Sequence, residues 1–322
     1  MVSKSAFRIV FMGTPDFAVE SLKALVENNY NVVGVVTNPD KPAGRGQQIR
    51  ESPVKKYAKE QGLTILQPEN LSDRDFIQRL KELDPMLQVV VAFKILPSEV
   101  FNIPEYGTFN LHASLLPDYR GAAPINHVII NGESKTGVTT FFLDDKVDTG
   151  KIIKKKATEI TQDETAGTLH DKLKMLGAEL VVETVETIRN NNYRAISQDE
   201  LIKNRQTLKK APKIFKEDCR IDWQKTCSEI YNFIRGLSPY PAAQTLLNNS
   251  DQILLKIFQA YPEKKVHEHA CGTLLSDHKN YIKVATPDGF IYLKEIQQSG
   301  KKKMDVKEFL KGFKNIEAFN AV

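Results

Sequence analysis

The sequence of 322 residues lacks any apolar run of the roughly 18–20 residues that a transmembrane helix needs. Its first eight residues lead into only a short apolar run, Ile9 to Met12, with neither the hydrophobic core nor the small-residue cleavage site of a secretory signal peptide. We therefore expect a protein that has no membrane-spanning segment and stays in the cytoplasm.

Cysteine is scarce as well. The three cysteines, Cys219, Cys227 and Cys271, form neither a Cys-x-x-Cys pair nor an even set, so we expect free thiols in a reducing compartment and no disulfide framework. The one close histidine pair, His267 and His269, lies in a charged segment, where solvated side chains explain it better than metal coordination does. We expect no metal.

Two well-known catalytic signatures are also missing. The first strand-to-helix turn reads Gly13-Thr14-Pro15-Asp16 in place of G-x-G-x-x-G, and Pro15 occupies backbone that would have to approach a pyrophosphate. The G-x-S-x-G elbow of the α/β-hydrolases is absent too. These absences disfavour an NAD enzyme and agree with chemistry that uses no serine nucleophile.

Strand-like and helix-like segments alternate through the first half of the chain. Strands are predicted at 7–12, 31–37, 64–66 and 87–93, with helices at 18–28, 53–61, 73–83 and 165–189. Thr14 is expected to cap the first helix, with Pro15 at its first position. The alternation predicts an α/β fold with a Rossmann-like, doubly wound, mostly parallel sheet.

The pattern changes after residue 189. A polar stretch leads into a lysine-rich segment, which is typical of a linker. A helix is predicted at 227–237, and about five short strands separated by turn signals follow it, which suits a small β-barrel of the oligonucleotide-binding (OB-like) kind. We therefore expect a catalytic domain over 1–189, a linker over 190–208 and an OB-like C-terminal domain over 209–322.

Charge is unevenly distributed along the chain. The formal net charge is +5, but residues 209–322 carry +6 and the remainder carries −1. The asymmetry suggests that the C-terminal domain faces a polyanion. Ordinary solubility charge explains the composition equally well.

A polar pair in an apolar segment is the most informative feature that is present. Within Phe109 to Pro117, Asn110 and His112 are two residues apart, so on a strand they project from the same face. Asp148, on the loop that follows the apolar run Val138 to Leu143, can supply a carboxylate partner. A satisfied core histidine beside a strand-end asparagine is the simpler alternative for an isolated Asn-x-His.

Further motifs share this order and spacing, and together they resemble the 10-formyltetrahydrofolate-dependent formyltransferases. The resemblance runs from about residue 7 to about residue 312. It is carried by Met-Gly-Thr-Pro-Asp-Phe-Ala at 12–18, Asp-Lys-Pro-Ala-Gly-Arg-Gly at 40–46, Asn-Leu-His-Ala-Ser-Leu-Leu-Pro at 110–117, Tyr-Arg-Gly-Ala-Ala-Pro-Ile at 119–125 and Asp-Thr-Gly at 148–150.

The resemblance implies a catalytic trio of Asn110, His112 and Asp148. The Asn110 amide and a protonated His112 would donate hydrogen bonds to the oxyanion that develops during formyl transfer. Asp148 would hold the imidazole or accept the proton of the amine through a water molecule. The donor would be 10-formyltetrahydrofolate, and the residues expected to bind it are Phe93, Leu96, Ser114, Leu115, Leu116, Pro117 and Leu143.

The loop at 40–46 and the basic C-terminal domain imply the branch of this family that formylates the α-amine of methionine on initiator tRNA. The residues expected to contact tRNA are Lys41, Arg45, Lys209, Lys210, Lys213, Lys301, Lys302 and Lys303. The chain departs from the usual family pattern at two places. Residues 92–97 read Ala-Phe-Lys-Ile-Leu-Pro where many members carry Ala-Tyr-Gly, and glutamines stand at 47–48 where many carry further lysines.

Two other functions stay open at this point. A folate-dependent formyltransferase for a small amine, such as glycinamide ribonucleotide or an amino sugar, would share the trio but would need no basic C-terminal domain. A pure nucleic-acid-binding protein would explain the barrel but would leave the trio without a role.

Overall fold

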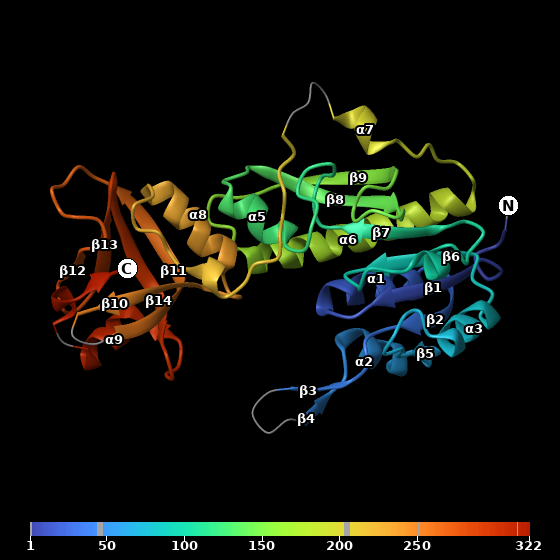
Figure 1. Ribbon diagram of the computed structural model, residues 1–322, viewed down its shortest axis with the longest axis horizontal. Helices are drawn as coiled ribbons and strands as arrows, with labels where there is room; N and C mark the ends of the chain where they lie inside the picture. The colour runs from blue at the N-terminus through green and yellow to red at the C-terminus, as the bar shows by residue number, and fades with distance from the viewer. Residues whose placement is uncertain (1, 44–47, 203–206, 250–251, 314) are drawn as a thin grey trace. The chain divides into compact units, whose positions relative to one another are not determined.

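The computed structural model describes residues 2–43, 48–202, 207–249, 252–313 and 315–322 (Figure 1). The chain divides into two compact units, and neither is a single stretch of sequence. Unit 1 comprises residues 1–121, 136–158 and 170–210, and unit 2 comprises residues 122–135, 159–169 and 211–322. No helix among the described residues is long and apolar enough to cross a membrane.

The core of unit 1 is a seven-stranded sheet with the order β5-β2-β1-β6-β7-β8-β9 (Figure 1). Its strands are β1 (Arg8–Gly13), β2 (Asn31–Val36), β5 (Ile65–Leu66), β6 (Leu87–Val91), β7 (Thr108–His112), β8 (Lys135–Phe142) and β9 (Ile152–Glu159). Strands β5, β2, β1, β6 and β7 pair in parallel, and β8 runs antiparallel to β7. This confirms the prediction of a mostly parallel, Rossmann-like sheet.

The predicted helices are present within one or two residues of their expected ends. They are α1 (Asp16–Glu27), α2 (Pro53–Glu60), α3 (Arg74–Glu82) and α6 (Ala166–Arg189), and the short α4 (Ser98–Phe101) and α7 (Gln198–Leu201) are additional. Helix α6 lies close to the sheet at Gly177, where a Cβ atom would come within 2.6 Å of Leu111 Cδ2 on β7. The odd-numbered side chains of β7 therefore face α6.

The predicted cap of α1 is wrong in detail. Pro15 occupies the N-cap position itself, without a side-chain hydrogen bond, and Asp16 begins the helix. The Thr14 hydroxyl instead accepts from the backbone N–H of Asn38 (3.3 Å) and from the Thr37 hydroxyl (3.4 Å). Thr14 thus links the ends of β1 and β2.

A two-stranded hairpin, β3 (Lys41–Ala43) and β4 (Gln48–Arg50), follows β2. The tip of this hairpin, with Arg45, lies outside the described residues.

Unit 2 is built on an antiparallel sheet with the order β12-β13-β14-β11-β10-β16, with β15 paired to β14. Its elements are α5 (Pro124–Ile130), η1 (Glu217–Cys219), α8 (Cys227–Leu237), β10 (Ala243–Asn248), β11 (Gln252–Lys264), β12 (Leu274–Ser276), β13 (Ile282–Thr286), β14 (Gly289–Gln298), β15 (Met304–Asp305), α9 (Val306–Gly312), η2 (Ile316–Ala318) and β16 (Asn320–Ala321). Thr273 and Asn320 form an antiparallel bridge, and Ala321 N–H donates to Gly272 (2.9 Å), so the two edges of the sheet meet. The sheet is a nearly closed barrel, as predicted.

Helix α8 begins with a capping box, in which the Thr226 hydroxyl accepts from the Glu229 N–H and the Glu229 carboxylate accepts from the Thr226 N–H. Its buried face, which includes Ile230 and Ile234, packs into the same apolar core as the barrel strands. The helix thus contributes directly to the core of unit 2.

Candidate active site

Strand β7 places Asn110 and His112 on the face of the sheet opposite Leu111. Asn110 is paired with Val90 on β6 and Phe141 on β8, at the centre of the sheet. Its side-chain amide forms no hydrogen bond with another of the described residues. The amide is therefore available to a ligand.

The His112 imidazole is held by one firm hydrogen bond. Its Nε2 lies 2.8 Å from the Tyr119 carbonyl oxygen, which can only accept, so geometry assigns the hydrogen to Nε2. Its Nδ1 lies 3.9 Å from Asp148 Oδ2. The nitrogen that remains for chemistry is Nδ1, and the carboxylate lies on that side.

Asp148 is fixed through both its backbone and its side chain. The Gly121 N–H donates to Asp148 Oδ2 (2.9 Å), and Asp148 has φ of 56°, in the left-handed region that few aspartates occupy. Gly150 explains the end of the Asp-Thr-Gly motif, because a Cβ at this position would lie 1.6 Å from the Phe142 carbonyl oxygen. The Asp-Thr-Gly motif thus supplies the Asp148 carboxylate and, two residues later, a position where only glycine fits.

The loop after β7 is held by hydrogen bonds within the loop and to side chains of β8 and β9. The Ser114 hydroxyl donates to the Asp118 carbonyl (2.7 Å), and the Thr139 hydroxyl donates to the Ser114 carbonyl (2.6 Å) and accepts from the Leu116 N–H (3.2 Å). The Lys155 ammonium also donates to the Leu116 carbonyl, and burial lowers the pKa of Lys155. Ser114 is fully buried, so its hydroxyl shapes the loop.

The apolar residues expected near the folate fall into two groups. Phe93, Leu96 and Leu143 pack in one cluster with Val10 and Met12 of β1. Leu143 also packs in a second cluster, which contains Leu116. The structure thus brings together the loops after β6, β7 and β8, at the carboxyl ends of β6 and β7 where open α/β sheets bind ligands.

Leu115 and Pro117 lie beside these clusters. The Leu115 side chain contacts Gly137 of β8, where an added Cβ would come within 2.7 Å of it. Pro117 is half-buried. Leu115 therefore packs against the sheet.

The lysines expected to contact tRNA are mostly exposed. Lys209 lies over the Tyr119 ring (6.0 Å) and Lys213 over the Phe215 ring (5.1 Å), while Lys303 forms an ion pair with Glu295 (2.8 Å). The remaining described members of this set, Lys41, Lys210, Lys301 and Lys302, are exposed at the surface. Lys303 is thus partly neutralised, whereas Lys41, Lys210, Lys301 and Lys302 are exposed.

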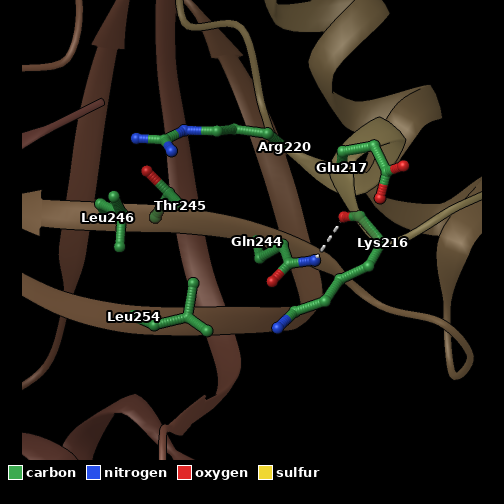
Figure 2. Close-up of a pocket in the computed structure, with 7 residues that line it drawn as sticks. All are labelled: Lys216, Glu217, Arg220, Gln244, Thr245, Leu246 and Leu254. Atoms are coloured by element: carbon green, nitrogen blue, oxygen red, sulfur yellow. Dashed lines mark hydrogen bonds between the residues drawn. The ribbon is translucent and has the colours of Figure 1, made fainter.

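Unit 2 contains a cavity of about 300 Å³ that sequence reasoning did not predict (Figure 2). It is lined by Lys216, Glu217, Arg220, Gln244, Thr245, Leu246 and Leu254. Lys216 and Arg220 come from the segment before α8, and the Gln244 amide donates to the Lys216 carbonyl (3.0 Å), which ties that segment to β10. Two cations therefore border a cavity on the barrel.

One group of potential metal ligands occurs among the described residues. Asp16, His170 and Asp171 bring one ligand atom each within 4.8 Å of one another. Lys174 forms ion pairs with Asp16 (2.8 Å) and Asp171 (3.2 Å), so one ammonium already contacts both carboxylates.

Three residues that hold His112 and Asp148 have roles that sequence reasoning did not predict: Tyr119, Gly121 and Gln198. Tyr119 and Gly121 act through backbone groups, which no side-chain pattern encodes. Gln198 lies in the stretch predicted as linker, but it is buried and donates to the carbonyls of Asp148 and Gly150.

Two family models match successive parts of the chain. The formyl transferase model matches residues 7–185, and the model of the formyl transferase C-terminal domain matches residues 213–314. Methionyl-tRNA formyltransferase of Bacteroides thetaiotaomicron is 52% identical over 97% of this chain and 98% of that protein. The enzyme of the same name from Azobacteroides pseudotrichonymphae is 55% identical over 97% of each chain.

This chain belongs to the methionyl-tRNA formyltransferase family. The fold of this family member also resembles more distant solved structures. A sugar 3N-formyl transferase, crystallised with dTDP and 5-N-formyl-THF, aligns with a TM-score of 0.63 and 22% identity over 92% of this chain and 99% of that one. HypX from Aquifex aeolicus, in complex with tetrahydrofolic acid, aligns with a TM-score of 0.61 and 18% identity over 95% of this chain and 48% of that one. These likenesses support the two-part formyltransferase fold.

Proposed function

We propose that this protein transfers the formyl group of 10-formyltetrahydrofolate to the α-amine of methionine on initiator tRNA, which gives N-formylmethionyl-tRNA for translation initiation. The observation that carries the proposal is the arrangement of Asn110, His112 and Asp148 in a chain that is about half identical to methionyl-tRNA formyltransferases along its length. We place the reaction in the cytoplasm.

Asn110 and His112 act on the tetrahedral intermediate. The amine has a pKa near ~7.7 by analogy with an N-terminus, so a sufficient fraction is neutral at pH 7 to attack the formyl carbon. The new C–N bond places negative charge on the formyl oxygen. The Asn110 amide and a protonated His112 Nδ1 donate hydrogen bonds to that oxygen.

Asp148 handles protons and orientation. Its carboxylate lies 3.9 Å from His112 Nδ1 and orients the imidazole, whose Nε2 is bound to the Tyr119 carbonyl. It also accepts the proton that the attacking amine loses, through a water molecule. When the bond to the folate nitrogen breaks, that nitrogen takes up a proton and leaves as tetrahydrofolate.

The folate is proposed to lie against the apolar clusters where the loops after β6, β7 and β8 meet. Phe93, Leu96, Leu116 and Leu143 supply apolar surface there. Ser114 and Leu115 fix the course of the loop, because their contacts are with the protein itself. We expect the pteridine to bind mainly main-chain groups.

The tRNA is proposed to contact the exposed lysines at 209–213 and 301–303, the hairpin with Lys41 and Arg45, and the cavity of unit 2 that Lys216 and Arg220 border. Lys216 and Arg220 extend the predicted set, because they carry two more charges suited to phosphate. The division into catalytic residues 1–189, linker 190–208 and tRNA-binding residues 209–322 belongs to the same proposal.

A competition assay tests the substrate. The purified chain is incubated with 10-formyltetrahydrofolate and, in parallel, with methionyl initiator tRNA, glycinamide ribonucleotide or a dTDP-amino sugar. We expect kcat/KM for the tRNA to exceed the others by at least about 10³, since the small amines make no phosphate contacts outside the site. A higher kcat/KM for either small amine would replace the proposal with the small-amine function.

A further inference from the structure

The segment after α6, predicted as a linker, is attached to the catalytic loop. Ile196 and Ile152 of β9 exchange both backbone hydrogen bonds (2.8 and 2.9 Å). Gln198 follows on α7 and is 1% exposed. A buried glutamine in a connecting segment needs a full set of partners, because each unsatisfied polar group costs roughly 1–3 kcal/mol.

Gln198 finds those partners in the active-site loops. Its Nε2 donates to the carbonyls of Asp148 and Gly150 (both 2.9 Å). Its Oε1 accepts from the Arg120 guanidinium, at 3.0 Å from Nε and 2.6 Å from Nη2. The carboxamide thus uses both donors and its acceptor.

Arg120 completes a ring of contacts around Asp148. The next residue in the chain, Gly121, donates its N–H to Asp148 Oδ2. The Arg120 side chain donates to Gln198, and the Gln198 amide donates to the Asp148 carbonyl. Asp148 is therefore held by hydrogen bonds at both its carboxylate and its backbone carbonyl. This grip maintains the left-handed φ of 56° and keeps the carboxylate 3.9 Å from the His112 imidazole.

We propose that Gln198, fixed by Arg120, is a positioning residue for formyl transfer, acting through Asp148. The inference rests on the proposed function, in which Asp148 takes part in the reaction. Gln198 touches no reacting atom. A glutamate at 198 has the same shape but no N–H donors, so only a carboxamide serves both the carbonyls and Arg120.

The test is a double-mutant cycle on the full chain. Steady-state formylation of charged initiator tRNA is measured for Gln198→Ala, Gln198→Glu, Asp148→Asn and the Gln198→Ala/Asp148→Asn double variant. Glu200→Gln, an exposed change on the same helix, is the control. Thermal unfolding of each variant is followed in parallel.

We expect both Gln198 variants to lower kcat about 10- to 100-fold, since small displacements of a catalytic group cost that much. KM for tRNA and for the formyl donor should change by less than about twofold. In the Asp148→Asn background, Gln198→Ala should add less than about a twofold loss, because the group that it positions is already disabled.

Wild-type kcat in a folded Gln198→Ala variant would overturn the proposal. Multiplicative losses in the double variant would do so too, since a merely structural role acts independently of Asp148. If Gln198→Ala does not fold, Arg120→Lys replaces it in the same cycle, because lysine cannot make the two-point contact. Failure of the proposed function is distinguishable: the wild-type chain would not formylate tRNA, and the cycle would then be run on hydrolysis of the formyl donor.

Discussion

At the scale of single residues, the site depends on backbone conformations that side chains alone do not reveal. Tyr119 and Asp148 both have positive φ (62° and 56°), and Gly121 has φ of 126°. Such conformations cost of order 1–3 kcal/mol each for non-glycine residues and persist where surrounding contacts fix them. Here the contacts are two hydrogen bonds: the Tyr119 carbonyl accepts from the His112 imidazole, and the Gly121 N–H donates to the Asp148 carboxylate.

The first prediction concerns the trio. Asn110→Ala, His112→Ala and Asp148→Ala should each lower kcat by about 10²–10³, because each removes an interaction made in the transition state. Measurement is by steady-state formylation of charged initiator tRNA, with circular dichroism to establish folding. Asn102→Ala, a change at the end of α4, serves as the control. A folded variant with the wild-type rate would remove that residue from the mechanism.

The second prediction concerns Gly150. Gly150→Ala should lower both stability and kcat, because the added Cβ would lie 1.6 Å from the Phe142 carbonyl oxygen and the loop that carries Asp148 must move. We expect at least about 2 kcal/mol in the free energy of unfolding, the range of an overpacked site. Gly312→Ala is the comparison, since nothing lies within 4 Å of its added Cβ and its φ is not in the left-handed region. Equal effects at the two positions would contradict the steric explanation.

At the scale of elements, the end of α6 is joined to Tyr30, the residue before β2, by a partly buried polar contact. The Tyr30 hydroxyl donates to Glu186 (2.6 Å), and Arg189 forms an ion pair with the same carboxylate (2.5 Å). These hydrogen bonds, from Arg189 first and then from Tyr30, lower the pKa of Glu186 to about 2. The end of the longest helix is thereby fixed to the parallel sheet.

The third prediction follows from that shift. A carboxylate whose folded pKa is depressed stabilises the protein above its ordinary pKa and loses the contribution as pH falls toward the folded value. The full shift would amount to about 3 kcal/mol. Because the Glu186 side chain is 39% exposed, solvent screening reduces this to about 1 kcal/mol.

Glu186→Gln should therefore lower stability by about 1 kcal/mol at pH 7, and the difference from wild type should shrink as pH falls from 4.5 toward 2. Urea unfolding at several pH values measures it. Glu183→Gln on the same helix is the control. A constant difference at all pH values would mean that packing, and not charge, accounts for the loss.

Elements with strong periodicity could be predicted from sequence, and those held by tertiary contacts could not. The buried strands and α6 follow from apolar runs and helical spacing. Strand β9, with its Lys154 and Lys156 at the sheet edge, has no apolar run that would predict it, because few of its side chains are buried. Helix α7 escaped prediction for a different reason, since Gln198 is polar and is buried by partners that are distant in sequence.

The site was predictable to a similar degree. The positions of Asn110 and His112 on one strand face follow from the two-residue period, and Asp148 lies beside them. The ring orientation of His112 depends on the Tyr119 carbonyl. The direction of that carbonyl is set by the left-handed conformation of Tyr119, which the local sequence does not encode. The cavity at Lys216 and Arg220 arises where β10 meets the segment before α8, a pairing remote in sequence.

At the scale of the whole molecule, charge is concentrated in the C-terminal third. Residues 209–322 carry a formal charge of +6, and the remainder carries −1. A ligand held by phosphates releases counterions when it binds, so its affinity falls with salt, whereas an apolar ligand responds much less. The two proposed substrates should therefore differ sharply in their salt dependence.

The fourth prediction makes this measurable. The slope of log K against log salt for tRNA should be steep, at roughly 0.7–0.9 per phosphate neutralised, and that for the formyl donor should be shallow. The Lys216→Ala/Arg220→Ala double variant should reduce the tRNA slope by about 1–2. Lys279→Ala/Lys307→Ala, two exposed lysines elsewhere in unit 2, is the matched control. Equal slopes in wild type and in the cavity variant would exclude the cavity from the tRNA interface.

The pairing of Lys209 and Lys210 with the loop at 118–120 has a consequence for cooperativity. Tyr119 N–H donates to the Lys209 carbonyl (2.6 Å), and Lys209 N–H donates to the Asp118 carboxylate (3.0 Å). The backbones of Arg120 and Lys210 form a parallel β-bridge. The other side of this loop holds the His112 imidazole through the Tyr119 carbonyl. A polyanion that orders the two lysines thus also orders the Tyr119 carbonyl, which accepts the imidazole hydrogen bond. If this raises the affinity for a ligand at the imidazole by some factor, thermodynamic reciprocity requires that ligand to raise the affinity for the polyanion by the same factor.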